Sequence, residues 1–167
     1  MGLHKMEISG VKPWRFQNGL NLSRADGKIK ASNRNGQKKG TGRMKRELGI
    51  GKCGLACCLC SENASCAGCD SGSCPDSERC ENRACCMKRG VSHCYACERD
   101  CKKGLLSKIK PYGFTLFLKR YGVERLLDCL AENEKSGVVY HREGIHGDYD
   151  SFDDAEKLIE FIQHGSR

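Results

Sequence analysis

Cysteine is the residue type whose abundance and spacing could do chemistry in this sequence. Fourteen of the 167 residues are cysteine, and thirteen of these lie between residues 53 and 101. Clustered thiols can form disulfides, hold zinc or hold an iron–sulfur cluster. The spacing of the thiols and the composition of the rest of the chain bear on the choice among these.

The cysteine spacings favour metal. Two cysteines separated by two residues occur three times, at 57–60, 66–69 and 94–97. A loop of this length lets two thiolates bind one ion, and two such loops complete a tetrahedral zinc site. The ferredoxin run C-x2-C-x2-C-x3-C-P is absent from the sequence. Zinc is therefore the favoured metal, and a [4Fe–4S] cluster is the alternative.

The start of the chain predicts a cytoplasmic protein. MGLHKMEISGVKPWRFQNGL lacks the apolar run of a secretory signal, and no stretch of the sequence is apolar enough for a membrane span. In a reducing cytoplasm, clustered cysteines bind metal or do redox chemistry more often than they form disulfides. We therefore predict no membrane association.

Charge and composition divide the chain into three zones. Residues 1–50 carry twelve Lys/Arg and three Asp/Glu without an apolar period, which predicts a basic, disordered arm. A solvated tail is the favoured interpretation of this arm. The alternatives are an arm that attracts nucleic acid or another polyanion, and an extension upstream of a start at Met44. Residues 51–103 contain only five large apolar side chains, too few for a core, so a metal-binding domain is predicted.

Residues 104–167 predict a helical region packed on that domain, and hence a small α-rich fold with little β. Four apolar residues follow the period of one helix face: Val123, Leu126, Leu127 and Leu130. The pattern also predicts a short helix at 105–109 that ends before Pro111 and Gly113, and a short strand at 138–141. A final helix is predicted between an N-cap at Ser151 and a stop at Gly165.

The order of the cysteines resembles a prokaryotic cysteine-rich family, domain of unknown function 3795. KCGLACCLC, CAGC and CENRACCMKRGVSHCYACERDC carry the resemblance, which spans about residues 51–165 and implies metal binding without a settled activity. It implies ten metal ligands: Cys53, Cys57, Cys60, Cys66, Cys69, Cys80, Cys85, Cys94, Cys97 and Cys101. Cys74 and His93 are further candidates, which would give two or three zinc sites. The pairing of the ligands stays open.

Three classes of function remain compatible with these residues. The first is a zinc-stabilised binding module for a nucleic acid or protein partner. The second is an iron–sulfur or thiol redox protein that uses the extra thiols Cys58 and Cys86. The third is an enzyme built on HREGIHGDYD at 141–150, which ranks last because a polar turn before a capped helix explains the same residues. We predict no catalytic residue and leave the oligomeric state open.

Overall fold

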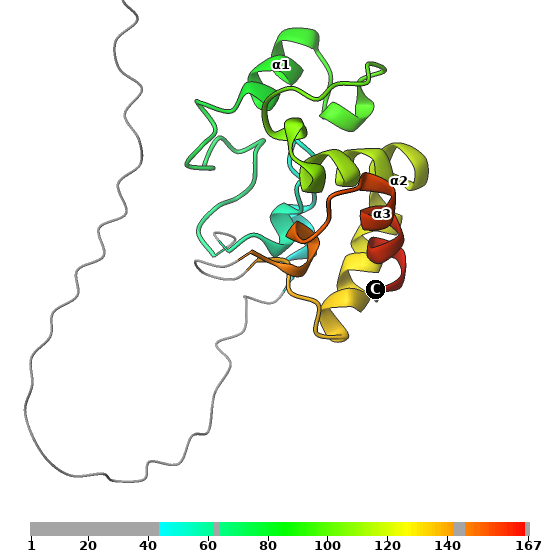
Figure 1. Cartoon of the computed structure of the whole chain (residues 1–167). Helices are drawn as coiled ribbons and strands as arrows, with labels where there is room; N and C mark the ends of the chain where they lie inside the picture. The colour runs from blue at the N-terminus through cyan, green and yellow to red at the C-terminus, as the bar shows by residue number, and fades with distance from the viewer. Residues whose placement is uncertain (1–43, 62–63, 142–145, 166–167) are drawn as a thin grey trace, which may run out of the picture. The chain divides into compact units, whose positions relative to one another are not determined.

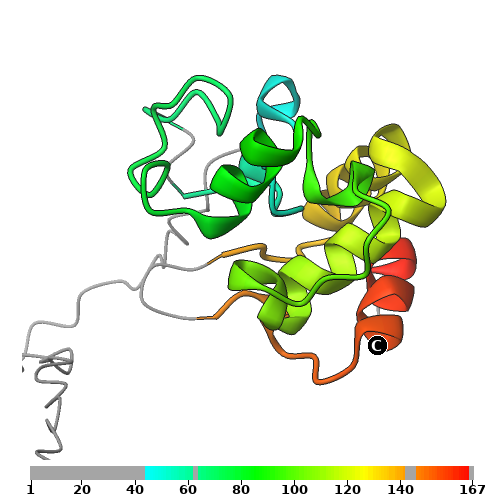
Figure 2. The same cartoon turned by 90° about the horizontal axis from the view of Figure 1, so that it is seen from above.

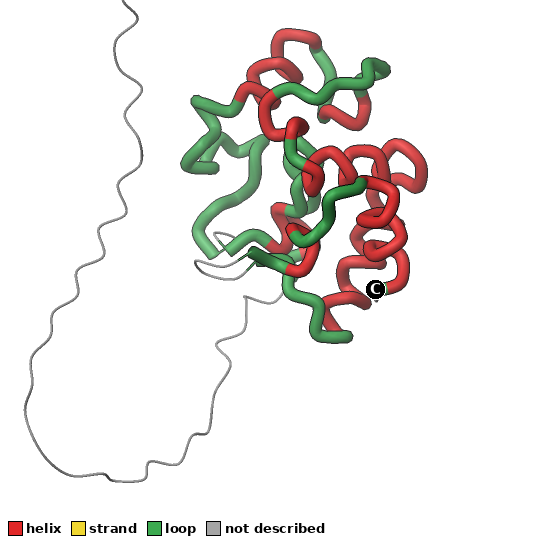
Figure 3. The backbone as a smooth tube through the Cα atoms, viewed as in Figure 1, coloured by secondary structure: helices red, strands yellow, loops and turns green. Residues whose placement is uncertain are grey.

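The computed structural model describes residues 44–61, 64–141 and 146–165 (Figure 1). These contain three α-helices, α1 (Glu81–Arg89), α2 (Ile109–Lys135) and α3 (Ala155–His164), and five short 3-10 helices. No strand occurs among them, so the predicted α-rich class is confirmed and the predicted strand at 138–141 is wrong (Figure 3). The backbone of Val139 instead contacts Asp148, donating to its Oδ2 at 2.7 Å and accepting from its amide at 2.8 Å.

Helix α2 begins earlier than the sequence pattern predicts. The short helix predicted at 105–109 is the 3-10 helix η4 (Gly104–Ser107), and Pro111 and Gly113 lie inside α2. Proline is tolerated there because the first turn of a helix has no acceptor for its missing N–H. Gly113 allows α3 to approach closely, since a Cβ at this position would lie 2.8 Å from Leu158 Cδ2. The kink in α2 falls at Gly122, where φ is 82°.

Helix α3 is capped by Asp154, so the predicted N-cap at Ser151 is wrong. Asp154 Oδ1 accepts hydrogen bonds from the amides of Glu156 and Lys157 at 2.9 and 3.0 Å. Ser151 instead follows the 3-10 helix η5 (Asp148–Asp150). The predicted stop at Gly165 is confirmed, because this residue adopts the left-handed conformation and its amide bonds to Phe161 O.

Helices α2 and α3 lie side by side and form the core (Figure 2). Aromatic rings fill the space between them and the segment around η5: Phe114, Tyr140, Tyr149 and Phe161 contact one another edge to face or tilted. Asn133 is buried among them and donates to Tyr149 Oη at 2.9 Å and to Ile162 O at 3.0 Å. The polar groups of the core are thereby satisfied where they are buried.

Residues 44–60 belong to this core, so the boundary of the predicted arm at residue 50 is wrong. Ile50 is buried, and Arg46 forms ion pairs with Glu124 and Asp128 of α2 at 2.7 and 2.8 Å. The amide of Ala56 donates to Tyr140 Oη at 2.9 Å inside the core. The first cysteine loop is therefore attached to the helices by buried contacts. Residues 1–43 of the predicted arm lie outside the described residues.

The next stretch, residues 61–103, has almost no core of its own. Among its described residues Cys86 is the one buried hydrophobic side chain. Its main element is α1, which begins after Cys80 and ends at the left-handed Gly90. A nine-residue helix is marginal in isolation, so other interactions must hold this stretch in place. No helix in the described part of the chain has the length and apolar character needed to cross a bilayer.

Candidate metal centres

Five cysteines line one cavity, here called the first thiol cavity. It encloses about 300 Å³ and is also bordered by Pro75 and Asp76. Its thiols are those of Cys57, Cys60, Cys66, Cys69 and Cys74. The 3-10 helix η2 (Cys57–Leu59) forms a tight turn in which the amide of Cys60 bonds to Cys57 O at 3.1 Å. This turn brings the two ends of the first C-x2-C pair to the same cavity.

The sulfurs of Cys57 and Cys69 converge over Gly51. A Cβ at position 51 would lie 3.1 Å from Cys57 Sγ and 3.3 Å from Cys69 Sγ, so only glycine leaves both sulfurs in place. A hydrogen bond from Cys57 lowers the pKa of the Cys69 thiol to about 6, while the same bond raises the pKa of Cys57. Two sulfurs that lie together over one glycine are arranged as a pair of thiolate ligands would be.

Nitrogen donors are aimed at several of the sulfurs. The amide of Gly68 donates to Cys66 Sγ at 3.4 Å, within the second C-x2-C loop. The amide of Arg83 donates to Cys80 Sγ at 3.5 Å at the start of α1. Hydrogen bonds of this kind favour the charged form of the acceptor. They therefore suit sulfurs that act as thiolate ligands.

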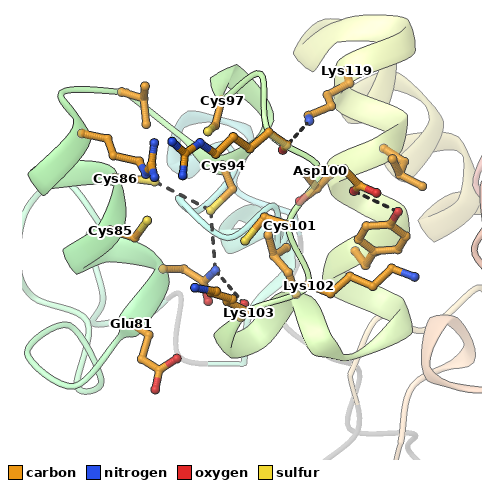
Figure 4. Close-up of a pocket in the computed structure, with 18 residues that line it drawn as sticks. Glu81, Cys85, Cys86, Cys94, Cys97, Asp100, Cys101, Lys102, Lys103 and Lys119 are labelled. Carbon is orange, nitrogen blue, oxygen red and sulfur yellow. Dashed lines mark hydrogen bonds between the residues drawn. The ribbon is translucent and has the colours of Figure 1, made fainter.

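A second group of cysteines lines another cavity, here called the second thiol cavity (Figure 4). It encloses about 370 Å³, and its thiols are those of Cys85, Cys86, Cys94, Cys97 and Cys101. The 3-10 helix η3 (Cys94–Ala96) repeats the geometry of η2, because the amide of Cys97 bonds to Cys94 O at 3.2 Å. Each cavity thus receives one C-x2-C pair from a turn of the same construction.

Asn82 holds the second thiol cavity together. Its Nδ2 donates to Cys94 Sγ at 3.6 Å and to Lys103 O at 3.2 Å, while its Oδ1 accepts from the amide of Leu105 at 2.8 Å. This buried amide therefore joins α1 to the loop that carries Cys94 and to the start of η4. Cys86 Sγ lies 3.7 Å from Cys94 Sγ, and burial raises the pKa of the Cys86 thiol to about 12.

Cys53, Cys80 and His93 line neither cavity. Burial raises the pKa of the Cys53 thiol to about 12, with smaller contributions in the same direction from the sulfurs of Cys69, Cys80 and Cys94. His93 Nε2 lies 3.2 Å from Ile50 O, which assigns the ring proton to that nitrogen. His93 Nδ1 is then a buried lone pair without a hydrogen-bond partner among the described residues. Such a nitrogen fits a metal ligand better than a structural histidine.

Eight of the ten ligands that the resemblance implies therefore lie around the two cavities, four at each. Cys53 and Cys80 do not, whereas the further candidate Cys74 lines the first cavity. Cys86 lines the second cavity although it falls outside the family pattern. Cys58 is fully buried in the helical core, away from both cavities. All fourteen cysteines are among the described residues, and no disulfide joins them.

The sulfurs line the cavities without meeting at one point. In the described residues, no three Cys, His, Asp or Glu side chains converge as closely as the ligands of a single ion. The donor set of each cavity nevertheless fits a thiophilic metal, because five thiols and nearby amide donors are gathered where apolar packing is scarce.

The acidic loop near the C-terminus serves the fold. Asp148 Oδ2 accepts from the amide of Val139, and Asp150 Oδ2 accepts from the amide of Gly147 at 2.9 Å and pairs with Lys110 Nζ at 3.0 Å. Both carboxylates are occupied by hydrogen bonds that close the turn before α3. This geometry is that of a polar turn, and residues 142–145 of the segment considered for an enzyme lie outside the described residues.

The chain finds no match among protein-family models, curated proteins or solved structures. The resemblance to domain of unknown function 3795 therefore stays a prediction.

Proposed function

We propose that this chain is a zinc-binding protein in which each thiol cavity holds one zinc ion, and that it serves as a binding module for nucleic acid. The observation that carries the proposal is the division of eight expected ligands into two groups of four. Four thiolates make the common structural zinc site, with Zn–S distances of about 2.3 Å. A cytoplasmic location and membership of the resembling family are part of this proposal.

The proposed role of zinc is structural. Residues 61–103 have one buried hydrophobic side chain among those described, so apolar burial contributes little there. Metal binding by thiolates supplies about 10–16 kcal/mol in zinc-finger peptides, and that energy becomes folding free energy. Zinc in the two cavities would hold α1 and the cysteine loops against the helical core. Residues 44–60 are attached to that core by their own buried contacts.

Cavity-specific variants test this proposal. Cys60→Ser with Cys66→Ser removes two ligands from the first cavity, and Cys97→Ser with Cys101→Ser removes two from the second. We expect elemental analysis to return about two zinc ions for the native chain and about one for each double variant. Cys129→Ser, which changes a thiol in the helical core, is the matched control and should keep both ions. Loss of all metal from both double variants would show a single shared centre and overturn the division.

A second candidate function is thiol redox chemistry, or an iron–sulfur centre of the [4Fe–4S] type, at the second cavity. The 3.7 Å between Cys86 Sγ and Cys94 Sγ favours the first of these. Hydrogen peroxide would join the two sulfurs in a disulfide and leave as two water molecules. Mass spectrometry should then show the loss of two hydrogen atoms confined to Cys86 and Cys94. Unchanged mass at this pair under peroxide would exclude the thiol redox function. A colourless protein without iron would exclude the iron–sulfur centre.

A further inference from the structure

Charge is strongly separated within the folded part of the chain. The net charge of residues 51–167 is nearly zero. Residues 79–120 nevertheless carry eleven Lys/Arg and three Asp/Glu, whereas residues 121–165 carry four Lys/Arg and eleven Asp/Glu. The basic segment comprises α1, the loop with Cys94, Cys97 and Cys101, and the first half of α2. The positive electrostatic potential of such a segment attracts polyanions.

Five basic residues of this segment surround the second thiol cavity, and we call them the basic rim: Arg89, Arg99, Lys102, Lys103 and Lys119. Figure 4 shows Lys102, Lys103 and Lys119 at the border of the cavity, with the sulfurs inside it. The lining includes two carboxylates, Glu81 and Asp100, so cations outnumber acids by five to two. Asp100 is engaged, because its Oδ1 accepts a hydrogen bond from Tyr112 at 3.1 Å.

All five rim cations are exposed and form no ion pair with a described residue. Lys102 Nζ lies over the Tyr112 ring and Lys119 Nζ donates to Arg99 O at 3.2 Å. No such contact with a described residue is made by the side chains of Arg89, Arg99 and Lys103. Elsewhere in the described chain six cations do pair with carboxylates, among them Lys135 with Glu132 and Lys157 with Asp153. The rim thus combines a high density of cations with few neutralising partners. That is the electrostatic pattern of a phosphate-binding surface.

We propose that the basic rim is the surface through which the folded domain binds the phosphate backbone of a nucleic acid. This inference deepens the proposed function and rests on it. The cations come from α1, the cysteine loop and α2, so they are spread over several elements and suit a chain of phosphates better than one anion. A metal held by Cys97 and Cys101 would fix the loop between them, and with it the position of Arg99.

The test neutralises, in the full-length chain, the three rim cations whose side chains make no hydrogen bond or cation–π contact with a described residue. Arg89→Gln, Arg99→Gln and Lys103→Gln together remove three positive charges and no side-chain hydrogen bond or ion pair found among the described residues. The matched control is Arg125→Gln, Lys135→Gln and Lys157→Gln, which makes the same charge change on α2 and α3. Fluorescence anisotropy with a labelled single-stranded oligonucleotide and a labelled duplex, across a range of salt concentrations, reports binding.

We expect the rim variant to lose at least about tenfold in affinity at 0.1 M salt. The slope of log affinity against log salt concentration should become shallower by about 2 for single strands and about 3 for duplex. Zinc content and helicity should equal those of the native chain. Equal, small losses in the rim and control variants would overturn the basic rim while leaving nucleic-acid binding through another segment intact. Absence of binding by the native chain would overturn both the rim and the proposed binding function.

Discussion

Substitution of Gly51 by alanine tests the convergence of sulfurs in the first thiol cavity without removing a ligand. The new Cβ would lie 3.1 Å from Cys57 Sγ and 3.3 Å from Cys69 Sγ, closer than ordinary van der Waals contact. Both sulfurs must therefore move by a few tenths of an ångström. Overpacking of this kind costs about 1–3 kcal/mol. If the two sulfurs bind one ion, this cost weakens the metal affinity of that cavity by about 5- to 150-fold.

The assay is competition against a chromogenic chelator, which resolves the two ions by the order of their release. We expect Gly51→Ala to release one ion at lower chelator concentration and the other as in the native chain. Gly137→Ala is the control, because its backbone is left-handed (φ 88°) and its Cβ meets nothing within 4 Å. It strains the fold by about 1–2 kcal/mol without touching a sulfur. Identical release curves for Gly51→Ala and the native chain would refute the convergence of Cys57 and Cys69 on one ion.

Chelation of zinc should raise amide hydrogen exchange throughout residues 61–103, because this stretch lacks an apolar core, and should leave α2 protected, because its apolar face is buried. Continued protection of both would contradict the structural role of the metal. Asp150→Asn should lower the free energy of unfolding by about 2–3 kcal/mol in urea titration, since Lys110 is largely buried and loses its charged partner; a loss below about 0.5 kcal/mol would show that solvent replaces the pair. Deletion of residues 1–43 should leave the thermal melting transition intact while reducing the salt dependence of oligonucleotide binding; failure to fold would show that this segment supports the domain.

The cysteine spacing predicts the local turns because the number of residues between two thiols restricts the loop that joins them. Both C-x2-C pairs that form 3-10 turns, at 57–60 and 94–97, were predictable in this sense. The division of the thiols between two cavities was not, since it depends on how distant loops pack. Cys86 shows the same limit: the spacing marks it as an extra thiol, but the direction of α1 turns its sulfur toward Cys94.

The helical region shows a different limit of sequence patterns. Ser151 and Asp154 are both good N-caps, and the choice between them follows from the burial of Tyr149, which places residues 148–150 in a separate turn. The sequence pattern does not separate residues 44–50 from the basic segment before them. Their contacts with the core are a single buried side chain, Ile50, and the ion pairs of Arg46, which produce no periodic apolar pattern. Contacts with residues far along the chain determine both outcomes.

X-ray absorption at the metal edge of the purified full-length protein tests the central claim most directly. The account predicts zinc at about two ions per chain, each surrounded by four sulfur atoms at about 2.3 Å. Zinc bound mainly by oxygen or nitrogen, iron with acid-labile sulfide, or fourteen reactive thiols without metal would contradict it.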